Sequence, residues 1–150
     1  MSKPEPLVPA HVNLRDFHFM PLEVGRLLDS ETWIQAAHQP FLGHALISLW
    51  CAAWHEVPAG SLPANRVVLA RKAHRTPAEF EEIADLALAG FIECSDGRLY
   101  HPVIAEKAKE AWEKRRDSKA RTAAATAAAS EARRRKSTVT DIVTDSVTDS

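Results

Sequence analysis

The stretch that decides the fold is Ser61–Pro102, SLPANRVVLARKAHRTPAEFEEIADLALAGFIECSDGRLYHP. A short apolar helix is expected to begin at Pro63. The N–H groups in the first turn of a helix have no partner within the helix, so proline, which lacks an N–H, is tolerated there. A second helix is expected after Thr76. The sequence Thr-Pro-Ala-Glu at 76–79 combines an N-cap, a proline at the first helical position and a glutamate that can complete a capping box. Gly90 is expected to end this helix as a C′ glycine.

A two-stranded hairpin is expected to follow the second helix. Residues 91–94 and 98–100 have the composition of strands, and Ser95-Asp96-Gly97 between them is typical of a tight hairpin turn. Ser61 and Leu62 are expected to form a small first strand that pairs with this hairpin. This order of elements predicts a mainly α winged helix-turn-helix domain. Its hairpin is the wing, and a long basic helical extension follows it.

The charge of the chain is divided along its length. Residues 1–102 carry 8 basic and 12 acidic side chains, residues 103–136 carry 11 and 5, and residues 137–150 carry three aspartates. An acidic body with a basic arm suggests that the arm meets a polyanion. We predict four segments: a flexible leader at 1–13, the winged-helix domain at 14–112, a basic Ala/Arg-rich helical arm at 113–136 and a low-complexity disordered tail at 137–150.

The composition also bounds the class of protein. Hydrophobic residues make up 45% of the chain, which is enough for a core. No apolar run approaches the length of a membrane span, and two cysteines do not form a disulfide framework, so we expect a soluble cytoplasmic protein without membrane contact. Glycine-rich phosphate loops, HExxH motifs and nucleophile elbows are absent from the sequence. We therefore predict no enzymatic activity and no cofactor.

Upstream of the fold-deciding stretch, apolar side chains at helical spacing predict three helices, at residues 21–28, 31–37 and 41–55. Ile34 is expected to point inward from the second helix. The third helix has the widest apolar face and is expected to be the central buried helix. The tryptophans could form a base-stacking platform, but most lie on apolar helical stripes. We therefore expect core packing for Trp33, Trp50, Trp54 and Trp112.

Three segments carry a resemblance to a known family. They are FMPLEVGRLLDSETW (Phe19–Trp33), LWCAAWHEVPAGSLP (Leu49–Pro63) and GFIECSDGRLYHPVIAEKAKEAWEK (Gly90–Lys114). Together they resemble the YdaU-like family of phage and prophage proteins, a domain of unknown function. The resemblance implies a winged helix related to phage replication-initiation proteins, working in the cytoplasm of a bacterial host. It implies no catalytic residues.

Two groups of basic side chains are candidates for DNA contact. The first is a basic corner ahead of the second helix, joined by one wing residue: Arg71, Lys72, His74, Arg75 and Arg98. The second lies on the arm: Lys114, Arg115, Arg116, Lys119, Arg121, Arg133, Arg134, Arg135 and Lys136. Cations that neutralise phosphates release counterions, which gives salt-sensitive and sequence-independent affinity. The alternative is that these are solvated charges, partly paired with interleaved carboxylates that hold the helix.

Four carboxylates on the second helix argue against base reading by that helix. Glu79, Glu81, Glu82 and Asp85 would face phosphates and repel them. The alternative function is therefore a protein–protein adaptor whose acidic helix, residues 79–85, docks a basic partner such as a helicase, a loader or an initiator. Pairing of the helices after Trp112 between two copies, which would make a homo-oligomer, is a further alternative.

Two cysteines and two histidines are of the right type for a zinc site. Cys51 and His55 are one turn apart on the central helix, and Cys94 and His101 flank the wing. The spacings are not those of a zinc finger, and a cysteine on a buried helix is usually a small core residue. We therefore predict no metal site and expect the four side chains to pack where the central helix meets the hairpin.

Overall fold

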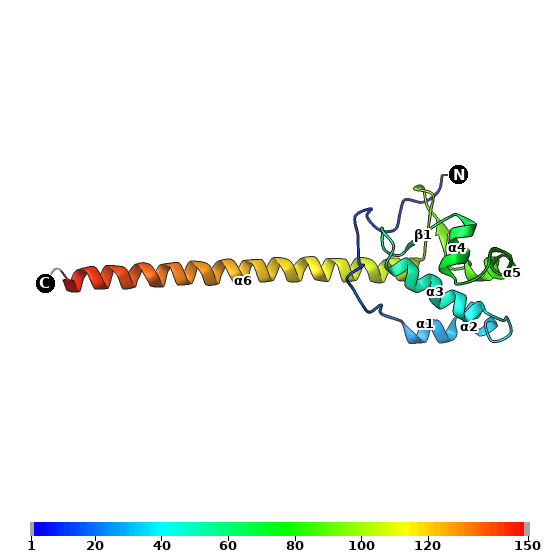
Figure 1. Cartoon of the computed structure of the whole chain (residues 1–150), viewed down its shortest axis with the longest axis horizontal. Helices are drawn as coiled ribbons and strands as arrows, with labels where there is room; N and C mark the ends of the chain where they lie inside the picture. Colours follow the sequence, from blue (N-terminus) through cyan, green and yellow to red (C-terminus); the bar gives the residue numbers. More distant parts are fainter. Residues whose placement is uncertain (1, 149–150) are drawn as a thin grey trace. The chain divides into compact units, whose positions relative to one another are not determined.

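The computed structural model describes the backbone of residues 2–148 and the side chains of residues 2–137 (Figure 1). It is mainly helical, with a small three-stranded antiparallel sheet and a long C-terminal helix. The chain divides into two compact units, and the division falls after Trp112. In chain order the elements are α1 (Val24–Asp29), α2 (Glu31–Gln35), α3 (Leu42–Trp54), β1 (Ser61–Pro63), α4 (Arg66–Lys72), α5 (Pro77–Ala87), β2 (Ile92–Glu93), β3 (Arg98–Tyr100) and α6 (Pro102–Thr148).

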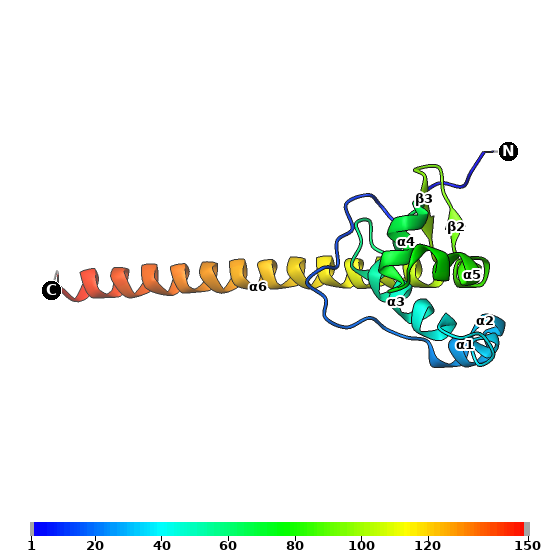
Figure 2. The same ribbon diagram turned by 45° about the vertical axis from the view of Figure 1, so that its right-hand side comes forward.

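The sheet has the strand order β1-β3-β2, with both pairs antiparallel. Ser61 of β1 and Ile92 of β2 both lie opposite Tyr100 of β3, and Figure 2 shows β2 and β3 as a hairpin. Gly97 has φ 78° in the turn, and its N–H donates to the Cys94 carbonyl at 2.9 Å. The predicted hairpin turn and the pairing of the first strand are confirmed.

The predicted start of α5 agrees with the structure, and the predicted start of α4 does not. The capping box of α5 is confirmed, because Glu79 N–H donates to Thr76 Oγ1 at 3.2 Å and Thr76 N–H donates to Glu79 Oε1 at 2.9 Å. The predicted start of α4 at Pro63 is wrong. Pro63 belongs to β1, and α4 begins after Asn65, whose side chain accepts from the Val67 and Val68 N–H groups. The Asn65 side chain accepts hydrogen bonds from N–H groups of the first helical turn, whereas a proline side chain has no acceptor for them.

Gly90 does not cap α5, so that prediction is also wrong. The helix ends at Ala87 with Leu88 as its C-cap, and among glycines only Gly60 and Gly97 have a positive φ in the described residues. Gly90 instead lies against an aromatic ring, since a Cβ there would lie 2.9 Å from His101 Nε2. The absence of a side chain is needed for close approach to the ring rather than for a left-handed turn.

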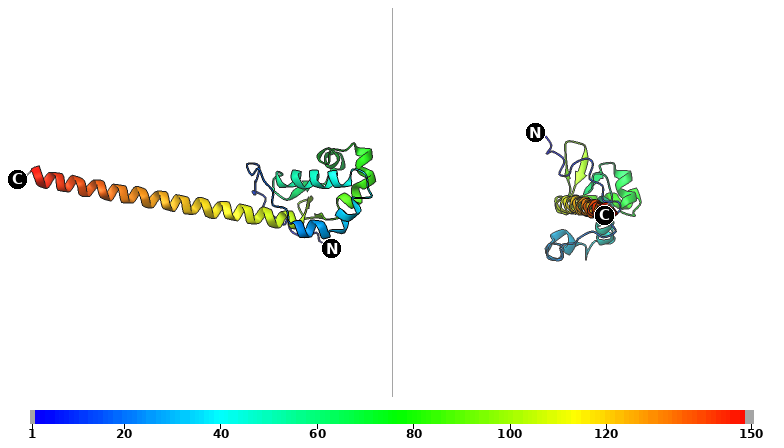
Figure 3. Two further views of the ribbon diagram at one scale, coloured as in Figure 1. Left: turned by 90° about the horizontal axis from the view of Figure 1, so that it is seen from below. Right: turned by 90° about the vertical axis from the view of Figure 1, so that its left-hand side faces the viewer.

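The first part of the core lies between α3, α4 and α5. Leu49, Leu69 and Phe80 contribute one fully buried side chain from each helix. Figures 2 and 3 place α3 between the α4–α5 pair and the α1–α2 pair. Trp33 and Trp50 pack against this core from their half-buried positions. The predicted central helix is therefore confirmed, and it spans Leu42–Trp54 rather than 41–55.

The second part of the core joins the N-terminal segment to the hairpin and the first turns of α6. Val8 and Val12 are almost fully buried in it. The Ser95 N–H donates to the Pro4 carbonyl at 2.8 Å, which fixes the segment to the hairpin. The segment predicted as a flexible leader, residues 1–13, therefore contributes two buried side chains to the core. Val8 and Val12 are one helical turn apart, but the segment around Pro9 is not helical, and their burial depends on the hairpin and α6, which are distant in the sequence.

The α1–α2 pair packs less completely than the sequence predicts. Neither helix contains a buried residue, and Ile34 is 56% exposed although it was expected to point inward. Each helix is only five or six residues long, which is less than two turns. So few residues do not establish a hydrophobic period, and the sequence therefore predicts the direction of a side chain poorly. Trp33 does pack inward, as predicted.

Helix α6 continues to Thr148 and so differs from the prediction of a disordered tail from residue 137. The residues between Trp112 and Ser137 are almost all exposed. Alanine has the highest helix propensity, and neither proline nor glycine occurs after Pro102 to interrupt the helix. The side chains of the low-complexity repeat, residues 139–150, lie outside the described residues.

Candidate functional sites

The basic arm is the segment 113–136 of α6. Among its nine basic residues only Arg115 is half-buried, and the others are exposed. Glu131 pairs with Arg134 and, at 3.5 Å, with Arg135 Nε. The arm contains no apolar side chain larger than alanine. This segment therefore offers charge and hydrogen-bond donors but no surface that could pack into a core.

The basic corner is a network rather than a row of free cations. Arg71 is exposed. His74, with φ 58°, places Nδ1 at 3.1 Å from Ser48 Oγ. The Arg75 guanidinium lies over the Phe41 ring at 4.3 Å from its centroid, a cation–π contact. Two of these side chains are therefore already bound to the start and middle of α3.

The remaining two residues of this predicted group meet at one carboxylate. Lys72 Nζ lies 3.1 Å from Glu56 Oε2, and Arg98 Nη2 lies 3.0 Å from Glu56 Oε1. Arg98 Nε also donates to Ser61 Oγ at 2.9 Å. Burial alone would raise the pKa of Glu56, but the hydrogen bonds from Lys72 and Arg98 outweigh it and lower that pKa. Arg98 thus holds the hairpin against the body and is only partly accessible.

The acidic face of α5 is exposed as the sequence suggests. Glu81, Glu82 and Asp85 are all exposed. Glu79 serves the capping box instead, and the hydrogen bonds from the backbone and side chain of Thr76 lower its pKa. Three carboxylates, rather than four, are therefore available on this face.

The four candidate zinc ligands do not come together. Cys94 is buried and His101 is largely buried, whereas Cys51 and His55 are exposed. His55 Nε2 lies 2.7 Å from the Phe17 carbonyl oxygen. No group of three or more His, Cys, Asp or Glu suited to a metal occurs in the described part of the chain. The expectation that all four pack beside the hairpin is wrong for Cys51 and His55.

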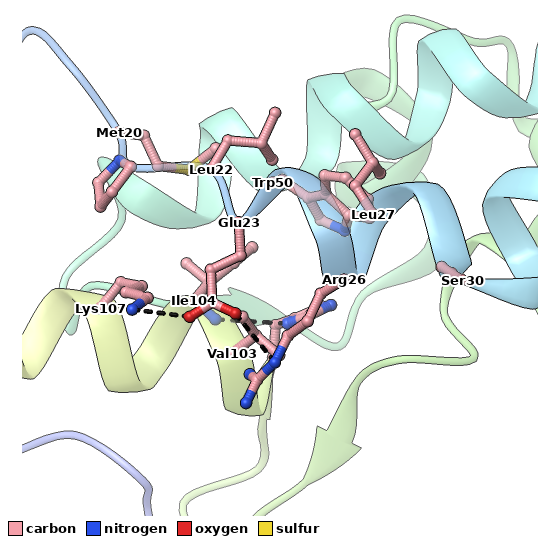
Figure 4. A pocket seen from close by; sticks show the side chains of 12 residues that line it. Met20, Leu22, Glu23, Arg26, Leu27, Ser30, Trp50, Val103, Ile104 and Lys107 are labelled. Atoms are coloured by element: carbon pink, nitrogen blue, oxygen red, sulfur yellow. Dashed lines mark hydrogen bonds and ion pairs between the residues drawn. The ribbon is translucent and has the colours of Figure 1, made fainter.

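Sequence reasoning missed a pocket of about 310 Å³ between α1, α3 and the start of α6 (Figure 4). Most of its lining is apolar, and the charged side chains come from α1 and α6. The lining residues are Met20, Pro21, Leu22, Glu23, Arg26, Leu27, Ser30, Trp50, His101, Val103, Ile104 and Lys107. Nothing in the sequence signals this cavity, because its residues come from three separate segments.

A chain of ion pairs runs along one side of the pocket. Glu23 lies between Lys107 Nζ at 2.8 Å and Arg26 Nε at 3.0 Å, as Figure 4 shows. Arg26 and Lys107 also approach Glu106 and Glu110, at 3.8 and 3.7 Å. The hydrogen bond from Lys107 lowers the pKa of Glu23, and the same bond raises the pKa of Lys107. Both basic groups are therefore occupied by carboxylates.

His101 lines the pocket and contacts two aromatic rings. Its ring meets Trp50 at 5.8 Å and Phe91 at 5.1 Å between centroids, both edge-on. Burial lowers the pKa of His101 to about 4, so the ring is neutral at pH 7. Nδ1 lies 3.4 Å from the Ile104 N–H, which makes it the acceptor and leaves the proton on Nε2 beside Gly90.

Fold and sites define a mainly helical protein with a small antiparallel sheet and a basic helical extension. A family model described as "Protein of unknown function (DUF1376)" matches residues 18–109. The match covers more than half of the chain, and the chain therefore belongs to this family. The matched residues include the sheet and the pocket, and the basic arm lies beyond them. The comparisons with curated proteins and with solved structures found no match.

Within residues 2–148, none of the helices combines the length and the apolar character that crossing a bilayer requires.

Proposed function

We propose that this chain is a replication-associated DNA-binding protein of phage or prophage type, which holds DNA through the phosphate contacts of its basic arm. The observation that carries the proposal is the composition of residues 113–136. They present nine basic and three acidic side chains on a helix without apolar side chains larger than alanine. The resemblance of three segments to YdaU-like proteins supports the phage and replication context.

The distribution of charge around the arm favours contact with phosphates over base reading. Successive residues of an α-helix are turned by about 100°, so Arg133–Lys136 project around most of the circumference. Arg116 and Arg133 are about 26 Å apart along the axis, which corresponds to many phosphates, since duplex DNA carries one charge per about 1.7 Å. Cations on all sides of a helix can meet phosphates in many registers, and affinity of this kind is independent of sequence.

A winged-helix interpretation of the body supports the same proposal. The order α3, β1, α4, α5, β2, β3 and the strand order β1-β3-β2 suit a winged helix with β2–β3 as its wing. In this interpretation α5 occupies the position of a recognition helix. Its exposed Glu81, Glu82 and Asp85 would repel phosphates, so we assign DNA contact to the arm rather than to α5.

A second function rests on the same three carboxylates. An exposed acidic helix face suits a basic protein partner, and in this alternative the body is an adaptor within a replication complex. The two functions use different surfaces, so one set of variants separates them.

The test is fluorescence anisotropy of a labelled duplex of arbitrary sequence with the full chain. Replacing Arg133, Arg134, Arg135 and Lys136 by glutamine should make the negative slope of log K against log salt shallower by about 3.6. The matched control is Glu81→Gln with Glu82→Gln, which should leave binding unchanged or strengthen it slightly. Equal affinity of wild type and the glutamine variant at about 50 mM salt would reject the Arg133–Lys136 cluster as a DNA contact.

A further inference from the structure

Histidine and arginine side chains from two separate segments meet where α3 contacts the α4–α5 pair. The rings of His44 and His74 meet edge-on with 5.7 Å between their centroids, and His74 Nδ1 lies 3.1 Å from Ser48 Oγ. Arg75 Nη2 lies 3.4 Å from His44 Nδ1. His44 and Ser48 are one turn apart on α3 and therefore share a face of that helix. We call His44, Ser48, His74 and Arg75 the His–Arg cluster.

The backbone is strained on both segments that supply this cluster. Phe41 (φ 70°) and His74 (φ 58°) are the only residues other than glycine with a left-handed backbone in the described part of the chain. Glycine adopts such φ values freely, whereas a bulky side chain makes them costly. Both side chains serve the cluster, because the Phe41 ring lies 4.3 Å from the Arg75 guanidinium and His74 contacts Ser48. Backbone strain of this kind is concentrated at functional sites.

Arg75 is held in place without being neutralised. Its guanidinium lies over an aromatic ring, and its Nε is buried without a hydrogen-bond partner among the described residues. In the same part of the chain, no carboxylate forms an ion pair with Arg75 or with either histidine of the cluster. Lys72 and Arg98, by contrast, share the carboxylate of Glu56. The positive charge of Arg75 therefore remains available to a ligand.

The carboxylate nearest to Arg75 in the sequence has another role. Glu79 Oε1 accepts a hydrogen bond from the Thr76 N–H at 2.9 Å, as part of the capping box of α5. The hydrogen bonds from Thr76 lower the pKa of Glu79 most, and the charge of Arg75 contributes less. The start of α3 adds no negative charge, since its first turn contains no acidic residue. The His–Arg cluster is therefore a positively charged site, which suits an anion.

The hydrogen-bond donors of the cluster suit a tetrahedral anion. Arg75 can only donate, so His44 Nδ1 is the acceptor in their contact and the proton of the neutral His44 ring lies on Nε2. The contact between His74 and Ser48 leaves a second donor: either the Ser48 hydroxyl or His74 Nε2–H, depending on the tautomer. A carboxylate offers two oxygens in one plane. Phosphate offers more oxygens in several directions, and arginine matches its geometry well.

We propose that the His–Arg cluster binds a phosphate group, either free phosphate or a phosphate monoester. Arg75 pairs with the charge of this group, and the Phe41 ring keeps the guanidinium in position. His44 and the His74–Ser48 pair donate hydrogen bonds to its oxygens. A single phosphate contact gives little affinity for duplex DNA. The site therefore takes a small ligand of its own, and the proposal does not depend on DNA binding by the arm.

The experiment follows the imidazole signals of the full chain in ¹H–¹⁵N spectra while inorganic phosphate is added at constant ionic strength. At about pH 7.5 most histidines with an ordinary pKa are neutral. The signals of His44 and His74, assigned with His44→Gln and His74→Asn, should shift until they saturate. The signal of His38, which is also exposed, should not follow them. Arg75→Gln should weaken the binding of phosphate by about tenfold or more.

Matched variants separate this site from general surface charge. His44 is exposed, so His44→Gln should remain folded and should also weaken binding. This variant keeps the test valid if circular dichroism shows that Arg75→Gln loses its fold. Arg66→Gln removes an exposed arginine at the opposite end of α4 and should leave binding unchanged. Replacing Arg133–Lys136 by glutamine should also leave it unchanged, which distinguishes the site from the arm.

A nucleoside 5′-monophosphate and the matching nucleoside distinguish the two sources of phosphate. Tighter binding of the monophosphate than of inorganic phosphate assigns the site to a monoester, and equal or weaker binding assigns it to free phosphate. The nucleoside should not shift the signals of His44 and His74, and shifts equal to those of the monophosphate would overturn the proposal. So would phosphate shifts no larger than that of His38, or an equal loss of affinity in Arg66→Gln and Arg75→Gln.

Discussion

The body up to Trp112 and the basic arm are helical for different reasons. In the body, helices are held by buried side chains such as Phe80 and Tyr100, which are fully excluded from solvent. In the arm almost every residue is exposed, and the helix rests on alanine propensity and a few surface ion pairs. The body therefore carries the stability of the fold, and the arm carries much of the positive charge. Substitutions should separate these two properties cleanly.

The largest effect should come from opening the core of the body. Phe80→Ala removes a fully buried ring between α3, α4 and α5, and truncations of this kind cost about 3–5 kcal/mol. Urea unfolding followed by tryptophan fluorescence measures the loss. The control, Thr126→Ala in the arm, should change the free energy of unfolding by less than about 0.5 kcal/mol. Equal losses of unfolding free energy in the two variants would contradict the conclusion that the body carries the stability of the fold.

Gly60→Ala should be the next largest perturbation. Gly60 has φ 86°, and a Cβ there would lie 2.8 Å from the Ala105 Cα of α6, where backbone has little room to move. Strain and overlap together should cost about 2–4 kcal/mol. Gly25→Ala in α1 is the opposite case, because its Cβ meets nothing within 4 Å. It should stabilise the body slightly, by about 0.5–1 kcal/mol. Thermal unfolding of both variants measures the contrast.

Acid should weaken the body through His101. The pKa of this buried histidine lies near 4, below the ordinary value of 6.5, so the unfolded chain binds a proton that the folded chain excludes. Stability is therefore complete above pH 6.5 and falls as the pH is lowered towards 4, by roughly 2–3 kcal/mol. Unfolding measured between pH 7 and pH 4.5 should show this slope, and His101→Phe should remove it. The window ends at 4.5 because Glu23, Glu56 and Glu79 protonate below it.

The smallest effect on the body should come from breaking the helix of the arm. Ala124→Gly with Ala128→Gly disfavours the arm by about 1 kcal/mol per site. Ellipticity at 222 nm should fall, while the tryptophan-monitored melting temperature stays the same. A parallel fall in both signals would show that the arm contributes to the stability of the body. The same spectra test the predicted disorder of residues 137–150 against the continuous α6.

Local chemistry explains which parts of the fold were predictable. The capping box at Thr76 and Glu79, the Asp96-Gly97 turn and the apolar stripe of α3 are each encoded within a few residues. The pairing of β1 with the hairpin was predicted, but its place beside β3 was not, because a hairpin has a free edge on each of its two strands. Sequence reasoning succeeds where a feature is determined by near neighbours.

The features that were missed depend on residues far apart in the chain. Val8 and Val12 are buried by the hairpin and by α6, which no local pattern reveals. Glu56 joins Lys72 of α4 to Arg98 of β3, so two predicted phosphate contacts became an internal network. The pocket requires α1, α3 and α6 together. By contrast, the arm was predictable as a charged helix, because composition alone determines its character.

The most direct test of the central claim compares the full chain with residues 1–112 in duplex DNA binding at two salt concentrations. We expect the full chain to bind at about 50 mM salt and to bind more weakly by orders of magnitude at about 200 mM. We expect residues 1–112 not to bind. Circular dichroism of the shorter chain confirms that it is folded. Equal binding by the two proteins would place the DNA contact in the body and would contradict the assignment to the arm.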